Sequence, residues 1–236
     1  MQKQIKTFVL NLEKKKYKYE ILKKKLDDLG IDHERFVAID GTEHTELFKK
    51  KKFGKEVYNG NIFDKSGLFR SYGAFGCLLS YIEIFKLSIK KNYEYIFLLQ
   101  DDIWFHKDFK NMYKKFLSYD FDALYLGSTI FGKKSNKELS NIIKNTCGLY
   151  GIILHKNTFS KILETMESFK FPADVCVCNV LKKEFEETSF ICYPKLIIAD
   201  RTSSTTCHDK HKEDHKKFYR IQKIDLKNYD MTYNFN

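Results

Sequence analysis

The pattern of apolar and polar positions divides the chain into short apolar runs and longer segments in which apolar residues recur every three to four positions. The short runs predict buried strands, and the wider spacing predicts helices with one apolar face. Strands are expected at residues 7–12, 35–39, 95–99, 123–126, 149–154, 190–192 and 196–198. Helices are expected at residues 17–29, 75–89, 108–117 and 159–166, the last of them capped by Asn157. Because strands and helices alternate, the sequence predicts one α/β domain with a largely parallel central sheet.

Turn signals and polar stretches mark the limits of these elements. Gly30 is expected to end the first helix, and Asp40-Gly41 is expected to turn the chain after the second strand. Residues 42–70 are polar without a clear period, which predicts a long surface excursion. Residues 208–236 are highly charged, which predicts a loosely held basic tail behind a domain that spans residues 1–207.

The composition is that of a folded and strongly basic domain. The chain has 236 residues, of which 43% are hydrophobic, enough for one sizeable core. Its 42 Lys and Arg against 31 Asp and Glu give a formal charge of +11, which favours nucleotide phosphates, nucleic acid or an acidic membrane face as partners. Lys, Asn, Ile, Phe and Tyr are all abundant, which AT-rich coding also produces, so the charge alone identifies no partner. The absence of an RNP string, a zinc finger and a helix-turn-helix signature argues against nucleic acid.

The start of the chain and the cysteine spacing favour a reducing compartment. The first apolar stretch ends at Leu12 and is too short for a signal-peptide core, and no apolar run is expected to be long enough to span a bilayer. The six cysteines contain no CxxC pair. We therefore expect a cytoplasmic protein with free thiols, whose membrane contact, if any, is peripheral.

A possible zinc site lies near the end of the chain, where the spacing of four residues suggests it: Cys207, His208, His211 and His215. A solvated charged tail is the more ordinary explanation.

An acidic pair, Asp101-Asp102, follows directly after the most apolar predicted strand, at residues 95–99. In open α/β sheets, ligands bind beyond the carboxyl ends of the strands. Two adjacent carboxylates there repel each other unless a cation offsets their charge. A Mg²⁺ or Mn²⁺ ion that also binds a diphosphate would do so, and it would stabilise a departing nucleoside diphosphate. The pair is equally well explained as a strand-ending turn in which aspartate accepts local hydrogen bonds.

Several segments, in the same order, resemble glycosyltransferase family 25, which includes lipooligosaccharide galactosyltransferases and collagen hydroxylysine galactosyltransferases. The most specific is the string G-A-F-G-C-L-L-S-Y at residues 73–81, which is similar to the family's G-E-I-G-C-x-L-S-H. The acidic pair lies in Q-D-D, which is similar to the family's E-D-D. The other matching segments are Phe8–Leu12, Ala38–Gly41, Phe121–Gly127, Gly148–Leu154 and Pro172–Asp174. Together they cover nearly the whole chain.

The resemblance implies a GT-A type fold, with a Rossmann-like mixed central sheet flanked by helices. It also implies inverting transfer of a hexose, galactose or glucose, from a UDP-sugar. The acceptor would be a hydroxyl of a glycan, a glycolipid or a collagen-like protein. Mn²⁺ or Mg²⁺ would assist, bound mainly by Asp102, while His208 reaches back to the metal or the diphosphate. Asp101 is expected nearer to the ribose or the donor sugar, where we count it among the catalytic residues.

Three positions depart from the family pattern. The family's Glu, His and Glu are Ala74, Tyr81 and Gln100 in this chain. Gln100 keeps a hydrogen-bond acceptor but brings no charge, so we expect weaker metal binding. These departures keep open an alternative in which the chain is a non-catalytic nucleotide- or glycan-binding relative of the family.

Asp174 is the expected catalytic base. It matches the family's P-x-D, and an inverting transfer requires a group that takes the proton from the acceptor hydroxyl. The alternative is an acidic residue at a helix N-terminus that the helix dipole stabilises.

The donor pocket is expected to contain residues at or beyond strand ends and one serine from the string at residues 73–81. These donor-binding candidates are Asn11, Lys18, Asp40, Ser80, Gln100 and Asp101. Three of these candidates also have a purely structural explanation. Lys18 would be a solvated lysine, Asp40 would be a turn residue, and Ser80 would bond to the carbonyl four residues earlier in its helix.

Overall fold

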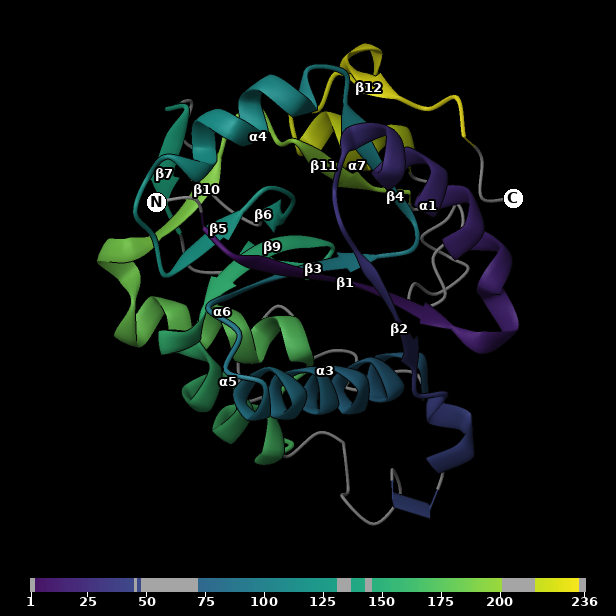
Figure 1. Cartoon of the computed structure of the whole chain (residues 1–236), viewed down its shortest axis with the longest axis vertical. Coiled ribbons are helices and arrows are strands. Elements are labelled where there is room, and N and C mark those ends of the chain that lie inside the picture. The colour runs from purple at the N-terminus through teal and green to yellow at the C-terminus, as the bar shows by residue number, and fades with distance from the viewer. Residues whose placement is uncertain are drawn as a thin grey trace.

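A seven-stranded sheet forms the centre of the molecule (Figure 1). The computed structural model describes residues 3–44, 46–47, 72–130, 137–142, 146–200 and 215–233. In spatial order the strands are β2 (Glu34–Ala38), β1 (Ile5–Leu12), β3 (Tyr95–Gln100), β9 (Gly151–His155), β5 (Ala123–Tyr125), β10 (Ser189–Cys192) and β7 (Leu139–Asn141).

The sheet is mixed. The pairs β2–β1, β1–β3 and β5–β10 are parallel, and the pairs β3–β9, β9–β5 and β10–β7 are antiparallel. The predicted α/β class with a central sheet flanked by helices is therefore confirmed. The expectation of a largely parallel sheet is wrong, because β9 runs against both of its neighbours.

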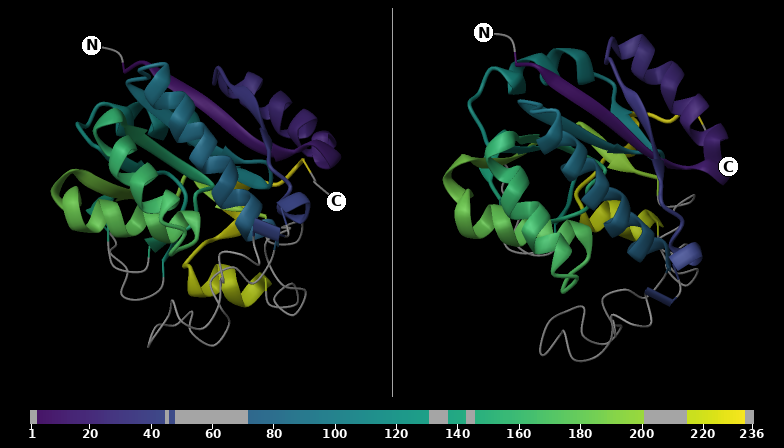
Figure 2. Two further views of the ribbon diagram at one scale, coloured as in Figure 1. Left: turned by 90° about the horizontal axis from the view of Figure 1, so that it is seen from below. Right: turned by 60° about the horizontal axis from the view of Figure 1, so that its bottom comes forward.

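Helices cover both faces of the sheet (Figures 1 and 2). On one face lie α1 (Lys16–Leu29) and α4 (Phe109–Leu117), and on the other α3 (Tyr72–Lys90), α5 (Phe159–Glu167) and α6 (Ala173–Glu184), side by side. Successive strand residues face opposite layers: Phe8 packs with α3, whereas Val9 packs with α1. Because both faces are buried, the central strands have continuous apolar runs.

Helix α3 has the length and composition of a membrane span, with a mean hydropathy of 1.2. The expectation that no segment would reach this length is therefore wrong for the part of the chain that the structure describes. Half of its most apolar window is buried inside the molecule, where Phe75, Leu78 and Phe85 pack in the core. Here α3 is thus a core helix of the α/β fold.

A second, three-stranded sheet lies beside the first and consists of β11 (Ile197–Ala199), β4 (Ile103–His106) and β12 (Tyr229–Asp230). Helix α7 (His215–Ile221) precedes β12. Two buried tyrosines hold this segment: the Tyr219 hydroxyl donates to the Ala199 carbonyl at 2.8 Å, and the Tyr229 hydroxyl donates to the Lys195 carbonyl at 2.6 Å. The expectation of a loosely held tail is therefore wrong for residues 215–233, whereas the division at residue 207 stays a prediction.

The remaining elements are short. Strands β6 (Thr129–Ile130) and β8 (Thr146–Cys147) form a two-stranded ribbon. Turns of 3-10 helix occur at Glu13–Lys15, Gly41–His44, Lys156–Thr158, Glu186–Thr188 and Leu226–Asn228. Most of the predicted excursion at 42–70 lies outside the described residues.

Two predicted helix ends have different outcomes. Gly30, at φ 71°, ends α1 in the left-handed conformation as expected. Asn157 does not cap α5, because it lies within the preceding 3-10 turn, and its side chain donates to Asp122 Oδ1 at 3.0 Å.

Candidate active site

A pocket of about 210 Å³ opens beyond the carboxyl ends of β1, β2 and β3. These strands are parallel, so their carboxyl ends meet at one edge of the sheet, where α/β proteins bind ligands. The polar and glycine residues that line it are Lys14, Lys15, Lys18, Asp40, Gly41, Thr42, Gly73, Gln100, Asp101 and Asp102. The structure thus brings together four of the predicted donor-binding residues and the predicted metal ligand Asp102.

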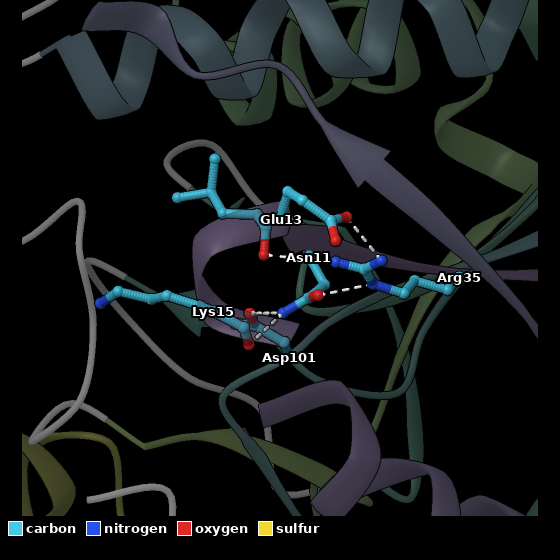
Figure 3. Close-up of polar contacts among 6 residues, drawn as sticks. Asn11, Glu13, Lys15, Arg35 and Asp101 are labelled. Atoms are coloured by element: carbon cyan, nitrogen blue, oxygen red, sulfur yellow. Dashed lines mark hydrogen bonds and ion pairs between the residues drawn. The ribbon is translucent and has the colours of Figure 1, made fainter. Parts of the chain in front are cut away.

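Asp101 faces the α1 side of the sheet (Figure 3). Its Oδ2 accepts a hydrogen bond of 2.6 Å from Nδ2 of Asn11, and the same nitrogen donates to the Lys15 carbonyl at 2.9 Å. Burial raises the pKa of Asp101, while the bond from Asn11 and then the charge of Lys18 oppose this shift. Asn11 itself is 1% exposed and does not line the pocket, so it acts there through its bonds to Asp101 and to the Lys15 carbonyl.

Asp102 is the more buried member of the pair, at 8% exposure. Burial, and then the charge of Asp101, raise the pKa of Asp102 well above its usual range. The charge of Lys18 opposes the shift, and that of Asp200 adds to it. Ionisation of Asp102 is therefore unfavourable beside Asp101, and a positive group bound next to the pair would favour the charged form.

Three lysines line the same pocket, and sequence reasoning singled out only Lys18 among them. Lys18 is 2% exposed, so its alternative as a solvated lysine is wrong. Burial, and then the charge of Lys18, lower the pKa of Lys15. Lys14 pairs with Asp40. The run Lys14-Lys15-Lys16 directly after the first strand was the signal that would have identified this cluster.

Asp40 is both a pocket residue and a turn residue. Its Oδ1 accepts from the Thr42 backbone N–H at 3.0 Å and from the Thr42 hydroxyl at 2.8 Å. Hydrogen bonds from Lys14 and Thr42 lower the pKa of Asp40 to about 2. The carboxylate is therefore charged at neutral pH and lies on the pocket wall.

Ser80 is not a donor-site residue, which corrects the prediction. Its hydroxyl is fully buried, donates to the Gly76 carbonyl at 2.7 Å and accepts from the Ile39 N–H at 2.8 Å. This is the back-bonded serine of the alternative, here used to attach α3 to the end of β2. Gly76 permits the contact, since a Cβ at this position would lie 2.4 Å from the Ile39 carbonyl oxygen.

Gln100 points to the α3 side, opposite to Asp101. Burial raises the pKa of Tyr81 well above its usual value, and a hydrogen bond with the Gln100 side chain opposes this. The Tyr81 hydroxyl also donates to the Leu149 carbonyl at 3.0 Å. Tyr81 and Gln100, two of the positions that depart from the family pattern, are therefore neighbours.

Asp174 lies in the first turn of α6 and is not part of the pocket lining. Its Oδ2 accepts from the Gly148 N–H at 3.1 Å, and its Oδ1 accepts from the Val175 N–H at 3.0 Å. Burial raises the pKa of Asp174 despite these bonds. Its charge reaches the pocket, since burial and then the charges of Asp174 and Asp102 raise the pKa of the pocket residue Cys77 to about 12.

Asp200 is a neighbour of the acidic pair that sequence reasoning missed, although it does not line the pocket. It is fully buried, and its N–H donates to the Asp102 carbonyl at 2.7 Å. Its position directly after β11 repeats that of Asp101 after β3, and this was the available signal.

The carboxylates fit a divalent ion only when a ligand contributes to its coordination. No group of three His, Cys, Asp or Glu side chains is arranged to hold a metal within the described ranges. Asp101 and Asp102 line one pocket, and Mg²⁺ is commonly held by one or two carboxylates together with substrate phosphates. His208, the other predicted ligand, lies outside the described residues, as do Cys207 and His211.

Comparison with known proteins agrees with the resemblance. The model for "Glycosyltransferase family 25 (LPS biosynthesis protein)" matches residues 4–177. The match covers most of the chain, which therefore belongs to glycosyltransferase family 25. The mixed sheet between two helix layers agrees with the GT-A type of fold expected for it.

Curated relatives include two insect proteins, each called "Glycosyltransferase 25 family member". The one from Drosophila melanogaster is 28% identical over 134 residues, which are 56% of this chain and 22% of the relative. The one from Aedes aegypti is 28% identical over 134 residues, which are 56% of this chain and 21% of the relative. This chain thus spans about a fifth of the length of these relatives. Among solved structures, a glycosyltransferase involved in the glycosylation of the major capsid of PBCV-1 is 10% identical, with a TM-score of 0.47, over 89% of this chain and 98% of that one.

Proposed function

We propose that this chain transfers a hexose, galactose or glucose, from a UDP-sugar to a hydroxyl of a glycan, a glycolipid or a collagen-like protein. The observation that carries the proposal is the acidic pair Asp101-Asp102 in one pocket with Lys14, Lys15 and Lys18. Family membership supports the reaction class. A pocket with both charges suits a ligand that combines phosphates with hydroxyl groups.

The two sides of the pocket would divide the donor between them. The lysines would bind the diphosphate, since ammonium groups are strong partners for phosphate oxygens. Asp40 would bind nucleotide hydroxyl groups, and Asp101 would bind those of the ribose or the donor sugar. Mn²⁺ or Mg²⁺ held by Asp102 would stabilise the charge on the departing UDP.

Asp174 would take the proton from the acceptor hydroxyl in an inverting attack. Burial raises the pKa of Asp174, which brings a carboxylate closer to the basicity that this task requires. Gly148 and Val175 hold its carboxylate in a fixed direction.

One observation favours a second function, that of a non-catalytic nucleotide- or glycan-binding protein. Tyr81 and Gln100, which replace a histidine and a glutamate of the family pattern, are bonded within the protein and bring no charge to the pocket. This alternative predicts binding of UDP without turnover.

The test is calorimetric titration with UDP, UDP-galactose and UDP-glucose, with and without Mn²⁺. We expect metal-dependent binding that Asp102→Asn weakens by at least about tenfold, since the variant loses a charged ligand. Asp120→Asn is the matched control, because its side chain is fully exposed and outside the pocket lining. Donor binding that is equal in wild type and Asp102→Asn, with no hydrolysis or transfer from any UDP-hexose, would refute the proposal. Binding lost in Asp102→Asn without turnover in wild type would favour the second function.

A further inference from the structure

A chain of hydrogen bonds crosses three adjacent strands and ends on the acidic pair (Figure 3). Arg35 in β2 donates from Nε to Oδ1 of Asn11 in β1 at 2.7 Å. Asn11 in turn donates from Nδ2 to Oδ2 of Asp101, directly after β3, at 2.6 Å. Arg35 is thus two hydrogen bonds away from a carboxylate that lines the pocket.

The chemistry of Arg35 determines which way the Asn11 amide points. An arginine side chain has only donors, so its partner on Asn11 is the amide oxygen. The amide nitrogen then faces Asp101 and the Lys15 carbonyl, both of which are acceptors. Rotation of the amide by half a turn would place two oxygens against each other at Asp101, and this contact is repulsive.

Arg35 is itself held firmly, as this role requires. Its side chain is 13% exposed. It donates to Glu13 Oε2 at 2.8 Å, and its guanidinium lies 5.8 Å from the centre of the Tyr19 ring. The ion pair is at the rim, with Glu13 mostly exposed. The inner contacts of the guanidinium are the bond to Asn11 and a longer one, of 3.4 Å, to the Leu12 carbonyl.

We propose that Arg35 is a positioning residue for the donor site, which orients Asn11 so that the amide holds Asp101 in place to bind donor hydroxyl groups. The inference rests on the proposed function of the pocket. Arg35 and Asn11 form a single unit in this role, because Arg35 reaches Asp101 through Asn11.

The first test is UDP binding by calorimetry in Arg35→Met, Asn11→Leu and the double variant. Removal of residues that orient a binding group commonly costs about 10–100-fold in affinity or activity, so each single variant should lose at least about tenfold. The double variant should bind within about twofold of Asn11→Leu, since both changes act on one unit. Arg35→Lys retains a donor and should recover part of the affinity. Glu13→Gln is the matched control: it removes the outer ion pair, keeps the bond to Asn11 and should bind as wild type.

The second test is independent of UDP. In nuclear magnetic resonance spectra, the Asn11 side-chain amide protons, assigned by their absence in Asn11→Leu, should exchange slowly in wild type and faster in folded Arg35→Met. Unchanged exchange, or additive affinity losses in the double variant, would overturn the inference. Failure of wild type to bind UDP would refute the proposed function instead, and the exchange comparison would still confirm or overturn the orienting role of Arg35.

Discussion

At the scale of single residues, the site depends on the alternation of side chains along β3. Leu98 faces the layer of α3, and Leu99 faces the layer of α1. The next two residues follow the same alternation. Gln100 therefore points toward Tyr81 on the α3 side, and Asp101 points toward Asn11 on the α1 side. Neighbouring residues therefore serve different walls of one pocket.

The proposed base can be tested by Asp174→Asn. The variant cannot accept a proton, so the transfer rate should fall by about 10²–10⁴-fold. UDP affinity should change by less than about twofold, since Asp174 does not line the donor pocket. An asparagine still offers one oxygen to the Gly148 N–H, but its amide nitrogen cannot accept from the Val175 N–H.

The pH profile provides a second readout of the same residue. A base acts in its ionised form, so transfer should decline as the pH falls through the pKa of Asp174. Because burial raises that pKa, the acidic limb should lie above pH ~3.9, the usual value for aspartate. Glu164→Gln, at an exposed position on α5, is the control and should leave the profile unchanged. Full transfer activity in Asp174→Asn would eliminate this residue as the base.

At the scale of elements, the pocket requires α3 to approach the end of β2 closely. Gly76 lies against the backbone of Ile39 and Gly41, and Ser80 bonds to Ile39 one turn later. The G-x-x-G-C-x-L-S string thus combines a contact that only glycine permits with a serine that fastens it.

Gly76→Ala should damage both stability and binding. The new Cβ would meet backbone atoms at 2.4–2.5 Å, which forces α3 and the turn at Gly41 apart. We expect a loss of about 1–3 kcal/mol in the free energy of unfolding, measured by urea titration. UDP affinity should fall as well, since Gly41 and Asp40 form part of the pocket wall.

Gly30→Ala is the matched control for this prediction. Gly30 has nothing within 4 Å of an added Cβ, but its φ of 71° strains any other residue. Gly30→Ala should therefore lower the free energy of unfolding by about 1–2 kcal/mol and leave UDP binding unchanged. Equal UDP affinity in Gly76→Ala and wild type would show that the close approach does not shape the pocket.

Elements with long apolar patterns could be predicted from the sequence, and short ones could not. The periods of α1 and α3 and the apolar run of β3 identify them without tertiary information. β4 and β12, with four and two residues, carry too little pattern; β4 pairs with both β11 and β12, and β12 exists because it pairs with β4. The direction of β9 was also unpredictable, since an apolar run reports burial and not orientation.

The site residues that lie at or directly after strand ends could be predicted from the sequence. Asp101, Asp102, Gln100 and Asp40 follow from this rule, and Asp200 obeys it too. The role of Asn11 and the bond from the Ile39 N–H to Ser80 were not predictable, because they depend on partners 24 to 90 residues away. A sequence shows that such residues are near strand ends, but not whether their hydrogen bonds are already satisfied by the protein.

At the scale of the whole molecule, residues 215–233 are part of the fold. Tyr219 and Tyr229 are buried against the second sheet, and β12 pairs with β4. Tyr219 also lies beside Trp104, with 6.5 Å between the ring centres. The late segment thus supports the strand that directly follows the acidic pair.

Tyr219→Ala should reduce the free energy of unfolding by about 3–5 kcal/mol, the usual cost of removing a buried aromatic ring. Ile221→Ala is the matched control, because Ile221 lies two residues away on the same helix and is 54% exposed. It should change stability by no more than about 0.5 kcal/mol. Similar urea midpoints for Tyr219→Ala and wild type would contradict the integral role of this segment.

The pairing of β4 with β12 also constrains the synthesis of the protein. More than a hundred residues separate the two strands along the chain, so one edge of β4 has no strand beside it while a ribosome is still making residues 107–228. An open strand edge in a nascent chain invites pairing with other chains. The acidic pair lies immediately before that edge. We therefore expect the nascent chain to depend on chaperones until residues 229–230 have been made and can pair with β4.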